Sequence, residues 1–114
     1  MTRIYKILSD AEWRAARAAG AFAGSAVDLA DGFIHFSTAA QAGETARRHF
    51  SGQAGLMVVG FEAEALGGAL KWEPSRGGEL FPHLYGPLPT ALAVSCEAVA
   101  LDAGGAPRLG ELAP

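Results

Sequence analysis

Two short segments of the chain hold most of the side chains that could perform chemistry. The first is Asp31–Thr38 (DGFIHFST), and the second is Trp72–Leu88 (WEPSRGGELFPHLYGPL). Each segment carries one histidine, and an imidazole can accept or donate a proton near neutral pH. We therefore expect a catalytic or binding site to form where these two segments open onto one cleft.

In the first segment, strand alternation puts Phe33, His35 and Ser37 on one face of an expected strand over Phe33–Ser37. Ser37 and Thr38 supply hydroxyls at the start of an expected helix, where free backbone N–H groups favour an anion. We predict His35 as a catalytic residue and Ser37 and Thr38 as cofactor-binding residues. The alternative is that one hydroxyl caps the helix and that His35 hydrogen-bonds to the backbone.

The second segment combines a carboxylate, a guanidinium beside two glycines, and alternating aromatic residues. Glu73 can act as a general base or accept from a hydroxyl, and Arg76 can grip a carboxylate or phosphate with two hydrogen bonds. Phe81, His83 and Tyr85 alternate and can face one side together. We predict Glu73 and His83 as catalytic residues and Arg76 and Tyr85 as cofactor-binding residues. Alternatively, Glu73 and Arg76 pair with each other in a surface loop and the aromatic residues fill the core.

Other chemistries find little support in the sequence. The single Cys96 excludes an internal disulfide and a multi-cysteine zinc site, and we expect it to pack in an apolar strand. No HxH or HExxH spacing is present, so we predict no metal site. The Walker, GxGxxG and GxSxG motifs are also absent. His49 follows two arginines and is expected at the surface.

Length and charge limit the kind of protein and its partners. The 114 residues fit one domain, and the nine basic and twelve acidic residues give a net charge of −3. Because the basic residues are scattered, we expect no nucleic-acid surface, whereas a small anionic molecule or nucleotide needs only one or two placed cations. The chain has no secretory signal and no apolar run long enough to span a membrane. We predict a cytoplasmic protein without a membrane partner; the sequence leaves the oligomeric state open.

The elements that position the two segments follow from periodicity and capping. Capping boxes at Ser9–Glu12 and Thr38–Gln41 predict helices over Asp10–Ala19 and Ala39–Phe50, and Ala21–Gly32 and Glu73–Pro82 are predicted as loops. Extended segments are predicted, in addition to Phe33–Ser37, at Arg3–Leu8, Leu56–Glu62, Ala69–Trp72, His83–Leu88 and Val94–Leu101. The expected fold class is α+β, with about six strands in a split or curved, mainly antiparallel sheet and two helices in the N-terminal half. We expect a single domain over residues 1–102 and a loosely packed C-terminal tail over residues 103–114.

The opening IYKI, the Trp-bearing helix, DGFIHFST, KWE, RGG and FPHLYGPL resemble domain-of-unknown-function family 952 from about Arg3 to Val94. This family is mainly bacterial and has no established activity. It is similar in fold to ADP-ribosyltransferases, including the RNA 2′-phosphotransferases that also consume NAD. The resemblance implies an ADP-ribosyltransferase-like fold with NAD as the suspected cofactor, held in a cleft between two small sheets.

The same resemblance implies roles for particular residues. Lys6 would be the cofactor-binding residue of the first strand, and Glu73 would accept a hydrogen bond from a ribose hydroxyl. Arg76 and the start of the second helix would hold the pyrophosphate, while His35 or His83 would position the acceptor. Tyr85 or Phe81 would stack on nicotinamide.

Three classes of function follow from these observations. The first is an NAD-consuming transferase or hydrolase, with ADP-ribosyltransferase-like glycosyl transfer as the possible reaction. The second is a non-catalytic binding module for a nucleotide or small anionic metabolite. The third is an accessory or interaction domain with a residual site.

Overall fold

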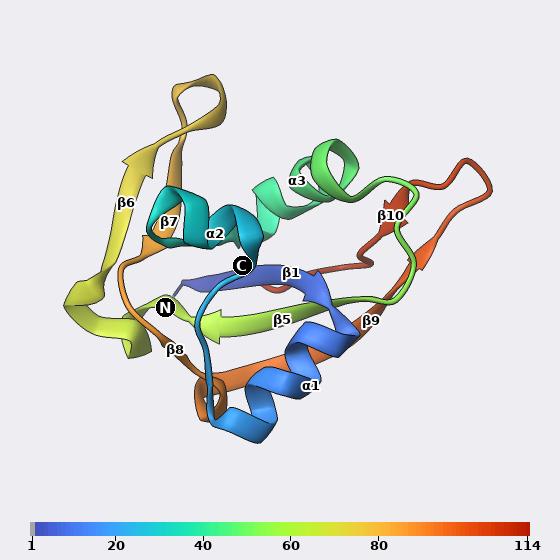
Figure 1. Cartoon of the computed structure of the whole chain (residues 1–114). Helices are drawn as coiled ribbons and strands as arrows, with labels where there is room; N and C mark the ends of the chain where they lie inside the picture. The colour runs from blue at the N-terminus through green and yellow to red at the C-terminus, as the bar shows by residue number, and fades with distance from the viewer. Residues whose placement is uncertain (1) are drawn as a thin grey trace.

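A computed structural model describes residues 2–114, and within them the largest element is a five-stranded antiparallel sheet (Figure 1). The order of its strands is β10-β9-β5-β1-β4. Their bounds are Arg3–Ser9 for β1, Ser37–Thr38 for β4, Leu56–Glu62 for β5, Ala93–Leu101 for β9 and Pro107–Arg108 for β10. The predicted strands at the N-terminus and over Leu56–Glu62 are confirmed, and β1 pairs with β5 along its whole length.

The interior strand β1 presents a different core to each face of this sheet. Ile4 and Leu8 pack with Trp13 of α1 (Asp10–Ala19), and Tyr5 and Ile7 pack with Ala46 of α3 (Ala39–Phe50). The two helices therefore cover opposite faces of the sheet, because successive side chains of a strand point to opposite sides. Lys6 lies between Ile4 and Leu8 on the α1 side and is buried.

Both long helices begin at the predicted capping boxes and have the predicted bounds. In α1, the Ser9 hydroxyl accepts from the Glu12 N–H at 3.0 Å, and the Glu12 carboxylate accepts from the Ser9 N–H at 3.2 Å. In α3, the Thr38 hydroxyl accepts from the Gln41 N–H at 3.3 Å, and the Gln41 side chain accepts from the Thr38 N–H at 3.1 Å. These reciprocal bonds satisfy backbone donors that have no partner inside the helix.

A smaller sheet stands beside the first and has the order β3-β7-β6 (Figure 1). Its strands are β3 (Ile34–His35), β6 (Leu70–Pro74) and β7 (Leu80–Leu84), and a separate pair is formed by β2 (Ala21–Phe22) and β8 (Leu88–Pro89). The α+β class and the mainly antiparallel sheet are thus confirmed. Because of this division, Asp31–Thr38 and Trp72–Leu88 lie where the five-stranded and three-stranded sheets meet.

The predicted continuous strand Phe33–Ser37 is wrong, because the chain changes sheets at Phe36. β3 pairs with β7, whereas β4 pairs with β1. The Phe36 ring packs edge-on against Phe61 with centroids 5.9 Å apart, and its N–H donates to the carbonyl of Pro82 at 3.0 Å. The break directs His35 to the small sheet and Ser37 to the large one.

Both predicted loops contain regular structure. The first holds β2 and α2 (Ala26–Asp31), a helix of six residues that is too short to give a periodic signal and that ends at Gly32 with φ of 87°. The second holds the start of β7 and a 3-10 turn, η2 (Arg76–Gly78). The remaining 3-10 turns are η1 (Ala63–Ala69) and η3 (Thr90–Leu92).

The C-terminal segment, expected from its composition as a loosely packed tail, contacts the large sheet at several points. β10 pairs with β9, and Leu109 and Leu112 pack on the core between the sheet and α3. The Tyr5 hydroxyl donates to the carbonyl of Ala113 at 2.7 Å. Apolar side chains and one buried tyrosine therefore hold a segment that is rich in Gly and Pro.

Cys96 is exposed, so the prediction that it packs in an apolar strand is wrong. The buried residue of β9 is Val99.

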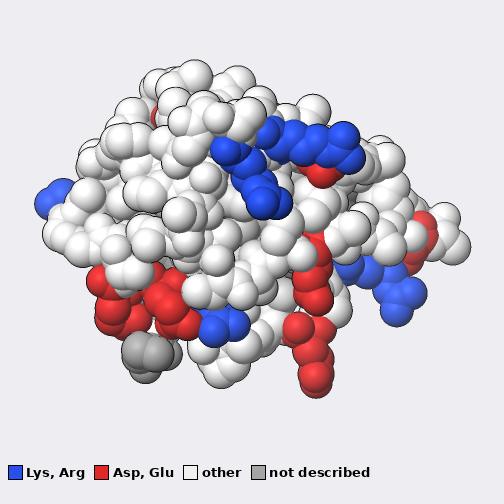
Figure 2. Space-filling model, turned by 90° about the horizontal axis from the view of Figure 1, so that it is seen from below, with Lys and Arg blue, Asp and Glu red and all other residues white. Residues whose placement is uncertain are grey.

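The charged side chains of the surface follow no simple pattern. Figure 2 shows that the charged side chains of the described residues form small groups on the face seen from below Figure 1, that acidic and basic side chains adjoin in some of these groups, and that uncharged surface lies between the groups. None of the helices within residues 2–114 is both long and apolar enough to cross a membrane.

Candidate functional site

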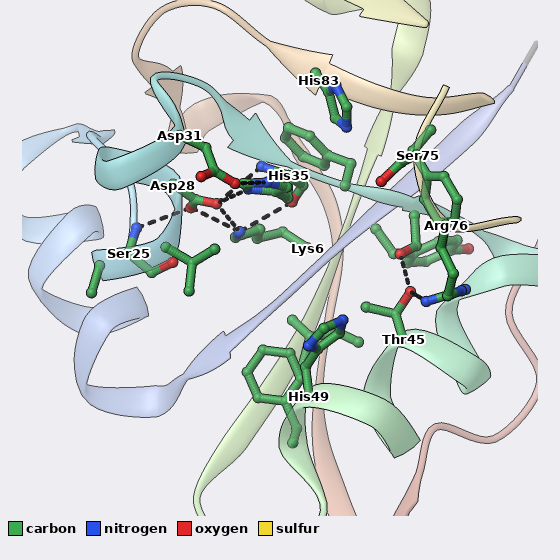
Figure 3. Close-up of a pocket in the computed structure, with 18 of the residues that line it drawn as sticks. Lys6, Ser25, Asp28, Asp31, His35, Thr45, His49, Ser75, Arg76 and His83 are labelled. Atoms are coloured by element: carbon green, nitrogen blue, oxygen red, sulfur yellow. Dashed lines mark hydrogen bonds and ion pairs between the residues drawn. The ribbon is translucent and has the colours of Figure 1, made fainter. Parts of the chain in front are cut away.

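A pocket of about 580 Å³ lies where α2, α3 and the small sheet converge on β1 (Figure 3). Its volume is within the range of small-molecule sites. Polar residues of both predicted segments line it: Asp31, His35 and Ser37 from the first, and Ser75, Arg76 and His83 from the second. The two segments therefore meet in one hollow, as the sequence predicts.

The two predicted histidines are neighbours across the small sheet. His35 of β3 is the cross-strand partner of His83 of β7, and their ring centroids are 5.5 Å apart. The Phe33 ring stacks on His83 at 4.1 Å and packs against His35 at 4.5 Å. This aromatic contact fixes the orientation of both imidazoles at the pocket wall.

A buried charge network forms one wall of the pocket and centres on Asp28, a residue that sequence reasoning did not select. The Lys6 ammonium donates to both Asp28 oxygens, at 3.0 and 2.8 Å, and to the backbone carbonyl of His35 at 3.0 Å. The imidazole of His35 lies between two carboxylates, with Nδ1 2.6 Å from Asp28 and Nε2 2.9 Å from Asp31. The predicted cofactor-binding residue Lys6 thus uses its three donors within the protein.

Burial and pairing act in opposite directions on the two central charges of this network. Desolvation by itself would raise the pKa of Asp28, but the hydrogen bond from His35 and the charge and hydrogen bonds of Lys6 outweigh it, so the pKa is well below its usual range. For Lys6, burial lowers the pKa of the ammonium, and the Asp28 carboxylate offsets part of that effect. Asp28 is therefore a stable carboxylate at neutral pH.

A second carboxylate holds the other histidine. His83 Nδ1 lies 2.8 Å from Glu73 Oε1, and the Tyr85 hydroxyl donates to the same oxygen at 2.7 Å. The hydrogen bonds from Tyr85 and His83 lower the pKa of Glu73, and the same carboxylate raises the pKa of the Tyr85 phenol. The His83 side chain is 6% exposed and points into the pocket (Figure 3).

Arg76 contributes a cation to the opposite side of the pocket. Its Nη1 donates to the Thr45 hydroxyl at 3.2 Å, and its guanidinium lies over the Phe81 ring, 4.9 Å from the centroid. The Thr45 hydroxyl in turn bonds to Ser37 at 2.9 Å. Among residues 2–114 no carboxylate forms an ion pair with Arg76, so the alternative pairing of Glu73 with Arg76 is wrong.

Three predicted site residues lie outside the pocket lining. Thr38 caps α3, which confirms the alternative that a hydroxyl at this position caps the helix. Glu73 lies behind His83 and contacts the site through that ring, while the exposed Tyr85 bonds to Glu73. Their contribution to a ligand site is therefore indirect.

Several pocket residues had no decisive signal in the sequence. Thr45 and His49 lie on α3 one turn apart, and His49 is exposed yet lines the pocket. Asp28 accepts from the Ser25 N–H at 2.9 Å, so the Ser–x–x–Asp spacing at the start of α2 was the one local indication of its position. Within the described part of the chain, no group of three or more His, Cys, Asp or Glu side chains is arranged to hold a metal ion.

Fold and site together define a small α+β domain with a mixed-charge pocket between two antiparallel sheets. The chain belongs to the family described as "Protein of unknown function (DUF952)", whose model matches residues 7–96. It is similar to the crystal structure of protein CC0527 from Caulobacter crescentus, with 59% identity, 95% of each chain covered and a TM-score of 0.93.

The chain is also similar to two further structures of CC0527. A crystal structure of its V27M/L66M double mutant has 57% identity, covers 95% of each chain and has a TM-score of 0.93. The solution NMR structure has 60% identity, covers 96% of this chain and 95% of that one, and has a TM-score of 0.86. No curated protein matches the chain.

Proposed function

We propose that the pocket binds a small anionic molecule and that Arg76 is its anchor. The observation that carries this proposal is a guanidinium at the pocket wall that has no carboxylate partner within residues 2–114. Thr45 and the Phe81 ring hold it in place while most of its five N–H donors stay available. A preoriented guanidinium suits carboxylate and phosphate groups, which it can bind with two parallel hydrogen bonds.

The surroundings of Arg76 support a small ligand over a polymeric one. The Thr45 hydroxyl adjoins the guanidinium and shares a hydrogen bond with Ser37, so one hydroxyl hydrogen of this pair stays available to a further ligand oxygen. The basic side chains form separated groups on the face seen in Figure 2, whereas a nucleic acid requires a continuous basic surface. The pocket volume of about 580 Å³ suits a ligand of drug size.

Within this proposal, nucleotides and NAD are the more specific candidate ligands, because their phosphate groups can bind the guanidinium of Arg76. In that case the contacts would come from Arg76, Ser37 and Thr45. Lys6 would act indirectly, since its ammonium holds Asp28 and the backbone of His35. Nicotinamide release would assign the protein to the NAD-consuming enzymes, and binding without release would assign it to the binding modules.

A thermal-shift and calorimetric panel tests the proposal with inorganic phosphate, simple carboxylates, AMP, ADP-ribose and NAD. A ligand at a hundred times its dissociation constant adds about 2.7 kcal/mol of stability. We expect at least one anion to bind, and Arg76→Ala to weaken it by about 10-fold or more, because a hydrogen bond to a charged group contributes about 1.5–3 kcal/mol.

Thr38→Ala is the matched control, because Thr38 caps α3 outside the pocket lining. Its unfolding free energy should fall by about 1 kcal/mol while its affinity for the anion stays at the wild-type value. No response to any anion at millimolar concentration, or equal affinities of the wild type and Arg76→Ala, would refute the proposal.

A further inference from the structure

Of the three histidines that line the pocket, the two on the small sheet differ in which ring nitrogens are engaged. Both nitrogens of His35 lie within hydrogen-bond distance of carboxylates, Asp28 at 2.6 Å and Asp31 at 2.9 Å. In His83, Nδ1 faces Glu73, and Nε2 has no hydrogen-bond partner within residues 2–114. Of these two, His83 is therefore the one that presents a free ring nitrogen to a ligand.

The surroundings of His83 fix both its position and its tautomer. Its side chain is 6% exposed and stacks on Phe33 at 4.1 Å, so the ring has little freedom to turn. A carboxylate only accepts hydrogen bonds, so the proton of the neutral ring lies on Nδ1 and the lone pair on Nε2. Tyr85 donates to the same Glu73 oxygen and lowers the pKa of Glu73, so the proton stays on Nδ1 of His83.

The spacing along β7 relates His83 to the proposed anion anchor. Phe81 carries the guanidinium of Arg76 on its ring face, and His83 is two residues further along the strand. Residues i and i+2 point to the same side of a strand and are about 7 Å apart. A ligand whose anionic group contacts Arg76 can therefore place a second polar group, on the order of 7 Å away, at His83.

We infer that His83 Nε2 accepts a hydrogen bond from a hydroxyl group of the bound anion, and that Glu73 is the positioning residue for His83. This inference rests on the proposed function of the pocket as an anion site. The Glu73 carboxylate holds the proton on Nδ1 and so keeps the lone pair of Nε2 directed to the ligand hydroxyl. The ligand class is a small carboxylate or phosphate that also carries a hydroxyl.

Several charged and titratable groups face His83. From β6 these are Glu73 and its neighbour Lys71, the direct cross-strand partner of His83. From β3 the facing group is His35, with Asp28 and Asp31 behind it, and on β7 itself it is Tyr85. The control variant must leave all of them in place. Thr38→Ala does so, since Thr38 caps α3 outside the pocket lining.

The test compares ribose 5-phosphate, which carries hydroxyls, with inorganic phosphate, which lacks the carbon chain. Calorimetry measures the affinity of each variant for both ligands. We expect Thr38→Ala to bind ribose 5-phosphate as tightly as the wild type, and His83→Gln to bind it more weakly. His83→Gln should bind ribose 5-phosphate about 3–10-fold more weakly and inorganic phosphate as tightly as the wild type, which corresponds to the loss of one hydrogen bond.

A long-range ¹⁵N NMR spectrum of the wild-type protein gives a readout that does not depend on the folding of a variant. We expect His83 to have its proton on Nδ1 in the free protein and its Nε2 resonance to move on addition of ribose 5-phosphate. A proton on Nε2 in the free protein, or an unchanged His83 resonance at saturation, would overturn the inference while leaving the anion site intact. Absence of binding to both phosphates, or binding that Arg76→Ala does not weaken, would instead remove the anion site itself and the inference with it.

Discussion

Replacement of Asp28 by Asn removes the carboxylate that neutralises Lys6 inside the fold. The two side chains are 2% and 7% exposed, so water cannot solvate the ammonium that remains. Loss of one partner of a buried ion pair costs about 3–5 kcal/mol, because the other charge stays buried without compensation. For a domain of this size 1 kcal/mol corresponds to about 4 °C, so we expect the melting temperature to fall by about 12–20 °C. Thermal and urea unfolding followed by circular dichroism measure the change.

The effect of this substitution depends on pH with a defined sign. Because the folded state lowers the pKa of Asp28 below its usual 3.8, the unfolded chain binds more protons in the acid range. The stabilisation by Asp28 is fully present above about pH 4 and is lost as the pH falls through the lowered folded pKa. The stability difference between wild type and Asp28→Asn should therefore be constant near neutral pH and should narrow below about pH 4.

Asp31→Asn is the matched control, since Asp31 also lies on α2 and also contacts His35, but its side chain is 50% exposed. An exposed ion pair contributes about 0–1 kcal/mol, so this variant should remain close to the wild type. Lys6→Met combined with Asp28→Leu removes both buried charges, and its cost should be smaller than the sum of the two single costs. Equal stabilities of Asp28→Asn and Asp31→Asn, or strict additivity in the double variant, would refute the reasoning about the buried pair.

Two further predictions concern packing and the Glu73 contact. Gly60→Ala should lower the unfolding free energy by about 1–3 kcal/mol, because a Cβ there overlaps the Ser95 side chain on the neighbouring strand. Gly43→Ala, where a Cβ has open space on α3, should raise it by up to about 1 kcal/mol; urea unfolding compares the two, and shifts of the same sign would contradict this account. Glu73→Gln should lower the raised pKa of Tyr85 towards the usual 10.0, measured by ultraviolet titration with Tyr85→Phe to assign the signal; an unchanged value would show that the carboxylate does not act on the phenol.

Much of the backbone could be predicted from local sequence signals. The capping boxes at Ser9 and Thr38 located the starts of both long helices, because the side chains that satisfy the first N–H groups come from the same turn. The alternation of β1 assigned its residues to two faces, since a strand has a period of two. The helix α2 was missed because six residues carry no measurable periodicity.

For the site, the sequence predicted that His35 and His83 would share a hollow, and they lie 5.5 Å apart. It did not predict that Asp28 would neutralise Lys6, a partner 22 positions away. Nor did it predict that Arg76 would rest on Thr45 and lack a carboxylate. Contacts between distant parts of a chain depend on how the sheets pack, and no local pattern records them.

What the sequence by itself determined was the inventory of reactive side chains and the local elements that carry them, because capping and alternation act within a few residues. Only the tertiary structure decided which of these side chains are hydrogen-bonded within the protein and which keep a polar atom available to a ligand. Both nitrogens of His35 lie within hydrogen-bond distance of carboxylates of α2, while His83 keeps one nitrogen towards the pocket. The physical reason is that the change of sheet at Phe36 brings α2, the small sheet and β1 together, and hydrogen bonds across that junction distribute the charges.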